Sequence, residues 1–432
     1  MPDGLGRQVP PGSFLMRTPT THPTFVSYFG ARPVDVEFDP VDGVEADPVG
    51  TTRRLVESAV ADRLISDVPL GCLLSGGIDS SIVALCMKRA GAGEVKTFSI
   101  GFDDDPRYDE SAHAAEVARH LGTTHREFRL SIDAIDVEGD LQKLATVFGE
   151  PFADSSAIPT HLLARETRKE VTVALGGDGG DELFGGYDRY RALALTARLR
   201  RVPGLSALAP LAKLLPAKHP KAKTARARRL LESLNRGDAE RYAGYLRIFS
   251  RQQLAELAPD WPTVEPYPLN ADDYDNDLVA AAAALDRRTY LPGDLLVKLD
   301  RCAMLHALEV RAPFMDRRLL RLSSTLRGEQ LVKNGRGKAL LRAAFAADLP
   351  PAVFNRRKMG FAVPIGKWFR GRLRPFLHDH LFATSAFSSR FNQATLGRFV
   401  EEHDAGIVDH GQRLYALLML ELWWRARAGG DL

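Results

Sequence analysis

The sequence predicts an α/β fold with a doubly wound, mostly parallel sheet, followed by a helical C-terminal part. Three observations predict it. Short apolar runs alternate with helical patterns between residues 51 and 190. Glycine-rich loops follow two of these runs, and strand signals fade beyond Tyr190. Alternating strands and helices build parallel sheets with helices on both faces.

The first 50 residues differ in composition from the rest of the chain. They are rich in Pro, Gly and Thr and contain two β-like runs, 13–17 and 24–29, whose separation suits a hairpin. A helix is expected from Thr51, where Leu55, Val56, Ala59, Val60 and Leu64 repeat at helical spacing. We therefore divide the chain into segments 1–50, 51–190 and 191–432.

The core elements follow in order from the hydrophobic pattern. The expected strands are 68–74, 95–102, 126–130 and 171–175, and the expected helices are 78–90, 110–121, 134–148 and 157–168. Segment 191–236 is rich in Ala, Leu and Arg and is expected to be helical, so its basic cluster at 217–229 is interpreted as a solvated helix face. The tail, 414–428, is a strong helical pattern.

Composition excludes several classes. The chain has 432 residues, which favours two domains, and 58 basic against 55 acidic residues, which gives no argument for nucleic-acid or membrane binding. Three cysteines without regular spacing argue against a disulfide scaffold or a zinc site. Without an 18-residue apolar stretch or a secretion-signal pattern, a cytoplasmic protein is expected.

The first motif is the string Ser75-Gly-Gly-Ile-Asp-Ser-Ser81 between an apolar strand and a helix. Glycines let the backbone approach an anion, and a helix N-terminus offers N–H groups to a phosphate. Asp79 would repel a phosphate unless a divalent cation bridged them, which points to Mg²⁺. The string lacks the lysine and spacing of a Walker A loop, and the full pattern disfavours an ordinary strand-to-helix turn.

The second motif is Gly176-Gly-Asp-Gly-Gly-Asp-Glu-Leu-Phe-Gly-Gly-Tyr187, again after a predicted strand. It holds three carboxylates within five residues among six glycines, which is costly unless a cation meets them. The alternatives are an exposed acidic turn or a calcium loop, and the absent EF-hand spacing disfavours calcium.

Together these strings resemble the N-type ATP pyrophosphatase family, and within it the asparagine synthetases. The strings Tyr290–Arg301, Leu308–Asp316 and Arg357–Pro364, with Trp368, also look like that synthetase core. The resemblance runs from about Thr51 to the last helix. It implies an adenine nucleotide alpha hydrolase-like sheet.

The resemblance also implies site residues. Leu73 and Ile100 would frame the adenine, and the pyrophosphate would be held by Ser75, Gly76, Gly77, Ser80, Ser81 and Gly177. Asp79 and Asp181 would bind Mg²⁺. Asp178 and Lys358 would be catalytic, one beside the acyl-adenylate and the other stabilising the leaving pyrophosphate. Glu309, Arg311 and Asp316 would shape the amino-acid pocket.

The implied reaction joins aspartate and ammonia to give asparagine, with ATP cleaved to AMP and pyrophosphate through a β-aspartyl-adenylate. An alternative is a related synthetase that closes a lactam ring, of the β-lactam synthetase or lasso-peptide cyclase type. The string Leu308–Asp316 favours the first reaction. A non-catalytic remnant is disfavoured by the presence of Asp79, Asp178, Asp181 and Lys358 together.

Glutamine-using members of that family begin with a glutaminase domain whose nucleophile is an N-terminal Cys. Here position 2 is Pro, and the runs at 9–17 and 25–29 resemble the last strands of such a domain. Segment 1–50 is thus interpreted as the remnant of a glutaminase domain, and the polypeptide alone is expected not to use glutamine. A separate glutaminase or a second copy of the chain is the expected partner.

Overall fold

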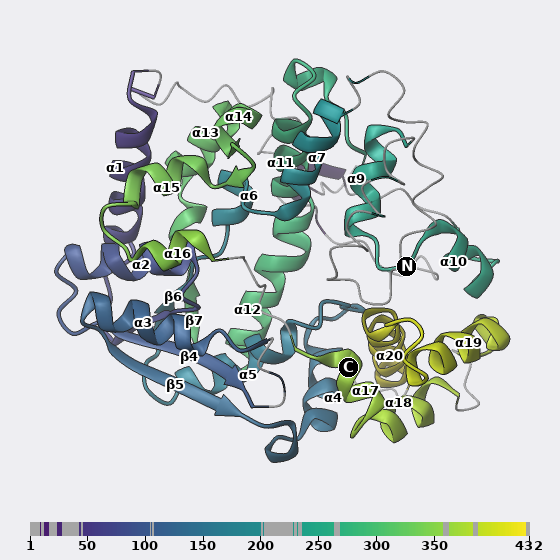
Figure 1. Ribbon diagram of the computed structural model, residues 1–432. Helices are drawn as coiled ribbons and strands as arrows, with labels where there is room; N and C mark the ends of the chain where they lie inside the picture. The colour runs from purple at the N-terminus through teal and green to yellow at the C-terminus, as the bar shows by residue number, and fades with distance from the viewer. Residues whose placement is uncertain are drawn as a thin grey trace.

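A computed structural model describes residues 46–103, 105, 108–199, 236–262, 268–356, 363–382 and 388–428, with short pieces at 9, 13–16, 24–27, 43–44, 202, 228 and 231. Its centre is a five-stranded parallel sheet in the order β5-β4-β3-β6-β7 (Figure 1). The strands are β3 (Leu70–Leu73), β4 (Lys96–Phe102), β5 (Thr124–Leu130), β6 (Val173–Leu175) and β7 (Glu309–Arg311). The predicted doubly wound α/β fold is confirmed.

The strand order places a topological switch between β3 and β6. From β3 the chain moves outward through β4 to β5, and then returns to β6 on the other side of β3. Loops at the carboxyl ends of two strands that flank such a switch diverge to opposite faces and leave a crevice for ligands. The two glycine-rich strings follow β3 and β6, so the fold brings them to one place.

Helices cover both faces of the sheet, each with its own apolar core. In chain order the helices of the core segment are α1 (Pro48–Ala61), α2 (Ile78–Arg89), α3 (Ser111–Leu121), α4 (Val137–Val147), α5 (Ala157–Thr167), α6 (Gly180–Phe184) and α7 (Asp188–Leu199). One core packs α4 and α5 with the C-terminal helices, and the other packs α1, α2 and α3 with the helices between residues 278 and 355.

The rest of the described chain is mostly helical, as predicted. Its α-helices are α9 (Asp238–Leu246), α10 (Arg251–Leu257), α11 (Leu278–Arg288), α12 (Val297–Met304), α13 (Arg317–Thr325), α14 (Gly328–Leu331), α15 (Ala339–Phe345), α16 (Pro351–Asn355), α17 (Ile365–Arg370), α18 (Arg374–Leu381), α19 (Gln393–Asp404) and α20 (Gly411–Ala428). A π-helical turn, η5 (Leu291–Leu296), precedes α12. Single 3₁₀ turns lie at η2 (Ile132–Ala134), η4 (Asp272–Tyr274), η6 (Pro313–Met315) and η7 (Ser388–Arg390).

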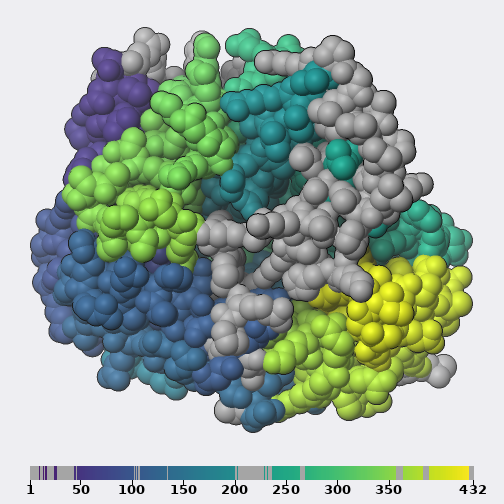
Figure 2. Space-filling view, viewed as in Figure 1, coloured from purple at the N-terminus to yellow at the C-terminus, as the bar shows by residue number. Residues whose placement is uncertain are grey.

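These later helices flank the sheet on two sides. In the space-filling view, the green segment that contains α13 to α16 lies above the blue core, and the yellow segment that ends in α20 lies at the lower right (Figure 2). Two short antiparallel pairs complete the fold: β1 (Ser13–Met16) with β2 (Thr24–Ser27), and β8 (Val332–Lys333) with β9 (Arg336–Gly337). The first is the predicted hairpin pairing.

The main difference from the predicted elements is β7. It pairs in parallel with β6, so the sheet extends into chain beyond residue 190. Three residues are too few to show a strand period, which explains why the pattern did not indicate it. Most of the predicted helical segment 191–236, with its basic cluster at 217–229, lies outside the described residues beyond α7. All three cysteines are free and buried, as expected.

Candidate active site

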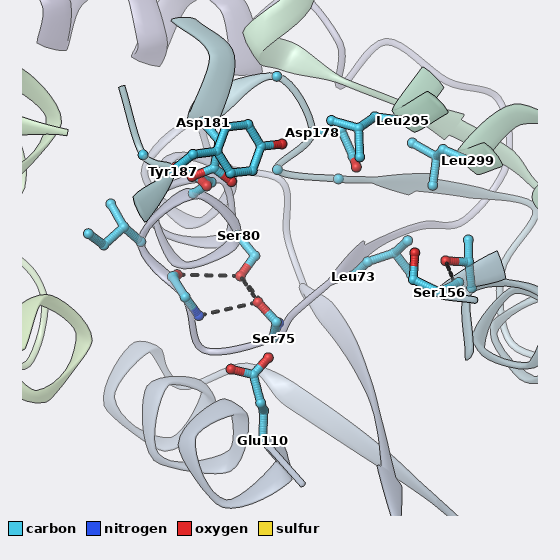
Figure 3. A pocket seen from close by; sticks show the side chains of 18 of the residues that line it. Leu73, Ser75, Ser80, Glu110, Ser156, Asp178, Asp181, Tyr187, Leu295 and Leu299 are labelled. Atoms are coloured by element: carbon cyan, nitrogen blue, oxygen red, sulfur yellow. Dashed lines mark hydrogen bonds between the residues drawn. The ribbon is translucent and has the colours of Figure 1, made fainter. Parts of the chain in front are cut away.

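The first glycine-rich string forms the loop between β3 and α2. Gly76 has φ +69°, and a methyl group there would lie 2.6 Å from the backbone carbon of His113, so only glycine fits. The loop is braced by its own serines: the Ser75 N–H donates to Ser80 Oγ over 3.2 Å, and the two hydroxyls are 3.1 Å apart (Figure 3). Gly77 begins α2 without a side-chain cap. The first turn of this helix therefore presents N–H groups that suit an anion.

The second string, after β6, packs directly against the first. A methyl group on Gly177 would lie 2.7 Å from Ser80 N, and one on Gly180 would lie 2.5 Å from Asp79 Cγ. Gly179 has φ +91° and begins the short helix α6. The glycines thus allow two backbone segments to interlock, and they bring the carboxylates of Asp79 and Asp181 to the same point.

A lysine that the sequence analysis did not identify lies between those two carboxylates. Lys338 Nζ is 2.7 Å from Asp181 Oδ1 and also pairs with Asp79. Burial alone would lower the pKa of Lys338, but Asp181 and Asp79 raise it above its ordinary value. Lys338 has φ +58° at the start of α15, and it follows Gly335-Arg336-Gly337. A non-glycine residue in this conformation is an indication of function, but φ is invisible in a sequence.

Asp178 projects from the same loop into the cavity (Figure 3). Burial raises the pKa of its carboxyl group above the usual range, while the nearby Lys298 opposes that rise. A carboxyl group whose pKa is raised in this way accepts a proton more readily than an exposed aspartate does.

Two tyrosines form part of the wall and are fixed by one arginine. The Arg189 guanidinium lies 3.7 Å from the centre of the Tyr187 ring and 4.6 Å from that of Tyr290. Asp286 holds the guanidinium through a 2.8 Å ion pair, and the Tyr187 hydroxyl donates to Glu182. Cation–π contacts on both rings keep them in place beside the cavity.

The cavity that these elements enclose has a volume of about 1010 Å³. It is far larger than the site of a single ion and matches a nucleotide with a second small substrate. Of the predicted residues, those that line it are Leu73, Ser75, Gly77, Asp79, Ser80, Ile100, Gly177, Asp178 and Asp181. Gly76 and Ser81 lie behind this lining, where Gly76 shapes the loop and Ser81 is fully buried.

Three predicted residues stand apart from this group, and a fourth is not described by the structure. Lys358 lies outside the described residues. Glu309, Arg311 and Asp316 do not line the cavity. Glu309 pairs with Arg311 over 2.6 Å at the edge of the sheet, and Arg311 also donates to the carbonyl groups of Arg63 and Ile65.

Asp316 instead caps α13. It accepts from the Arg318 N–H over 2.9 Å and pairs with Arg63 over 3.1 Å. Although burial works in the other direction, these partners hold the pKa of Asp316 at about 2. The charges of all three predicted pocket residues are therefore met by neighbouring side chains and backbone groups outside the lining of the cavity.

The carboxylates at the meeting of the two loops fit Mg²⁺ delivered with a nucleotide. Mg²⁺ is commonly held by one or two carboxylates together with substrate phosphates. Among the described residues, no group of three or more acidic, histidine or cysteine side chains is arranged to hold a metal ion by itself, so the phosphates would complete the coordination. Asp79 and Asp181 would supply the two carboxylates, which pair with Lys338 in this structure.

Comparison with known proteins agrees with this geometry. Residues 51–425 match the family model described as asparagine synthase. The chain is 32% identical over 430 residues to the glutamine-hydrolysing asparagine synthetase 1 of Bacillus subtilis (strain 168), an alignment that covers 98% of this chain and 65% of that protein. It is 33% identical over 412 residues to a putative glutamine-hydrolysing asparagine synthetase of Mycobacterium bovis, covering 92% of this chain and 60% of the relative.

A further match is confined to part of the chain. The glutamine-hydrolysing asparagine synthetase 1 of Arabidopsis thaliana is 38% identical over 146 residues, which cover 31% of this chain and 24% of the plant protein. The chain thus spans 60–65% of the length of the two bacterial relatives described above. Within the described residues, every helix is too short or too polar to cross a membrane.

Proposed function

The chain belongs to the asparagine synthase family, and from this premise we propose that it joins aspartate and ammonia in an amide bond, cleaving ATP to AMP and pyrophosphate. The observation that carries the proposal is the meeting of the two glycine-rich loops beside Lys338, at the switch point of the sheet. The relatives reported above are named asparagine synthetases, which favours this reaction over lactam closure.

A carboxylate needs activation because its oxygen is a poor leaving group. The aspartate β-carboxylate attacks the α-phosphorus of ATP, the bond to the β-phosphate oxygen breaks, and pyrophosphate leaves. The N-terminus of α2, Ser75 and Ser80 hold the pyrophosphate, while Leu73 and Ile100 frame the adenine. Mg²⁺, held by Asp79 and Asp181, would neutralise the phosphates.

Ammonia then attacks the acyl carbon of the β-aspartyl-adenylate, and AMP leaves. The attacking nitrogen loses a proton, and we propose that Asp178 accepts it, because the buried carboxyl group of Asp178 lies in the cavity wall. Lys338 supplies positive charge for the phosphate oxygens, and Lys358 is proposed for the same role on the basis of the family resemblance.

Pyrophosphate release tests the proposal. The wild-type chain should release pyrophosphate from Mg-ATP only when L-aspartate is present, and asparagine should form when ammonium chloride is added. Asp79→Asn should lower this release at least about 100-fold because it removes a charge at the metal and phosphate site. Asp133→Asn, whose side chain is 83% exposed, is the matched control and should leave it unchanged. Release that does not depend on aspartate would refute the assigned substrate.

A further inference from the structure

The two glycine-rich strings explain how the site accepts phosphates, but not how it recognises the length of a phosphate chain. Among the described residues, six cationic side chains line the cavity. Four of them pair with carboxylates: Lys298 with Asp154, Lys338 with Asp79 and Asp181, Arg356 with Glu110, and Arg191 with Asp188. The other two, Arg336 and Arg342, form no ion pair with any described residue. We call them the arginine pair.

Arg342 is held in place by backbone carbonyl groups. Its Nε donates to the Gly337 carbonyl over 2.7 Å, and one of its terminal nitrogens donates to the Phe354 carbonyl. The Arg342 N–H donates to the Lys338 carbonyl over 2.9 Å, so Arg342 lies one turn of α15 beyond the lysine that pairs with Asp79. Neutral carbonyl groups fix the orientation of a guanidinium but do not cancel its charge. That charge therefore stays available to a ligand.

Arg336 lies near Arg342 and has no partner of its own among the described residues. It is exposed on β9 and forms neither a hydrogen bond nor an ion pair with any of them. Burial, followed by the charges of Arg336 and Arg191, lowers the pKa of Arg342. Guanidinium groups that repel one another at the wall of a cavity are stabilised by an anion between them. The arginine pair therefore favours a negatively charged ligand.

The arginine pair lies on the side of the cavity that the second glycine-rich string forms. In Figure 3, Leu73 and Asp181 lie on opposite sides of Ser80. Asp181 belongs to the second string, and β9 packs directly on that string, because a methyl group on Gly337 would overlap the Gly185 carbonyl. A nucleotide whose adenine lies against Leu73 therefore extends its phosphates past Ser80 towards the arginine pair.

We propose that Arg336 and Arg342 bind the terminal phosphate of the nucleotide and so determine specificity for a triphosphate over a diphosphate. The inference rests on the proposed function, in which ATP occupies the cavity with its adenine against Leu73. The N-terminus of α2 offers N–H groups to any phosphate of the chain, so by itself it does not select the chain length. A guanidinium fork matches two phosphate oxygens, and only the third phosphate reaches this pair.

Binding of nucleotides with different chain lengths tests the assignment without any chemistry. Titration calorimetry would use the full chain with Mg²⁺, in the absence of aspartate, and the probes would be ATP, ADP and AMP. The wild type should bind ATP about 10- to 100-fold more tightly than ADP. Arg336→Met should lower the affinity for ATP about 10-fold and leave the affinities for ADP and AMP within about threefold.

Arg336 is the first residue to change, because it has no partner among the described residues whose loss would disturb folding. Arg342→Lys keeps the positive charge but loses the fork, so it should lower the ATP-to-ADP affinity ratio less than Arg342→Met does. The matched control is Lys333→Met. Lys333 is the cross-strand partner of Arg336 in the β8–β9 pair, is exposed and lies outside the cavity lining. Its loss should leave the ratio unchanged.

An ATP-to-ADP affinity ratio in Arg336→Met equal to that of the wild type overturns the proposal. Equal weakening of ATP, ADP and AMP overturns it as well, because a structural role would not distinguish chain lengths. The same is true if Lys333→Met lowers the ratio as much as Arg336→Met, since a general electrostatic field would then explain the effect. Failure of the proposed function is seen separately: the variants change the ratio as expected, but the wild type releases no aspartate-dependent pyrophosphate.

Discussion

The two ends of the cavity are built in different ways. The phosphate end is made by two contiguous strings, Ser75–Ser81 and Gly176–Tyr187, each at the end of a strand. The opposite end joins side chains that are far apart in the chain: Asp154 and Lys298 are separated by 144 positions, and Ser155 and Gln412 by 257. A site built from backbone is encoded in short strings, whereas one built from side chains depends on packing between distant helices.

The largest expected effect comes from breaking a long-range contact of the phosphate end. Lys338→Met removes the ammonium between Asp79 and Asp181 and leaves two buried carboxylates, which should cost about 3–5 kcal/mol of unfolding free energy. Urea-induced unfolding measures the loss. Mg²⁺ should recover part of it, because the metal can bind the same carboxylates. Lys333→Met, at an exposed position on β8, is the control. A loss below about 1 kcal/mol would contradict the assigned role.

The next effect concerns Asp294 at the opposite end and depends on pH. Burial, followed by the charge of Asp154, raises the pKa of Asp294 to about 7 from 3.8. Between pH 3.8 and about pH 7 the folded chain holds a proton on Asp294 that the unfolded chain releases. The contribution of Asp294 to the free energy of unfolding therefore falls as pH rises, and it is fully lost above about pH 7.

Asp294→Asn, which imitates the neutral acid, should remove this dependence. Relative to wild type it should gain stability on the order of 2–4 kcal/mol between pH 4 and pH 8, as measured by urea unfolding at both values. Parallel pH curves for the variant and the wild type would show that Asp294 is ionised in the folded chain.

A smaller effect tests the interlocked backbone of the phosphate end. Gly177→Ala places a methyl group 2.7 Å from Ser80 N and should cost about 1–3 kcal/mol of stability while raising the KM for ATP. Gly397→Ala is the control, because nothing lies within 4 Å of its added methyl group on α19. That variant should gain about 0.5–1 kcal/mol. An unchanged KM for ATP in Gly177→Ala would show that ATP binding does not depend on the contact between the two loops.

The smallest effect tests whether Asp316 belongs to the opposite end of the cavity. Asp316→Ala removes the cap of α13 and should cost about 1–2 kcal/mol of stability. The KM for aspartate should stay within about twofold, because Asp316 is outside the cavity lining. Steady-state kinetics with L-aspartate decides this. A large rise in KM would return Asp316 to the amino-acid pocket.

The contrast between the two ends also explains how much could be predicted from the sequence. Most of the sheet, its flanking helices and the phosphate end follow from local patterns, since glycine conformation and strand-to-helix turns are encoded within a few residues. Lys338 was missed because its function depends on a left-handed backbone and on carboxylates more than 150 positions away. The nearest sequence signal is its place after Gly335 and Gly337.

The sequence contains weaker signals for the opposite end of the cavity. Asp294 and Lys298 are four residues apart after a Pro-Gly pair, a spacing that places two charges on one helix face. Asp154 is in a loop, and nothing local shows that it faces Lys298. The string Leu308–Asp316 indicated the family, but its charged residues form the edge strand and cap the next helix instead of lining the cavity.

The position of Gln412 has a consequence for the order in which the protein is made. Gln412 lies in the first turn of α20 and donates to Ser155 Oγ over 3.0 Å, while Leu414, Tyr415 and Leu418 are buried in the core that also contains α4 and α5. During translation the sheet and both glycine-rich loops emerge long before this helix. The cavity wall closes only after residue 412 has left the ribosome. Until then apolar surface on α4 and α5 is exposed, and the nascent chain can hold a phosphate loop without yet enclosing a substrate.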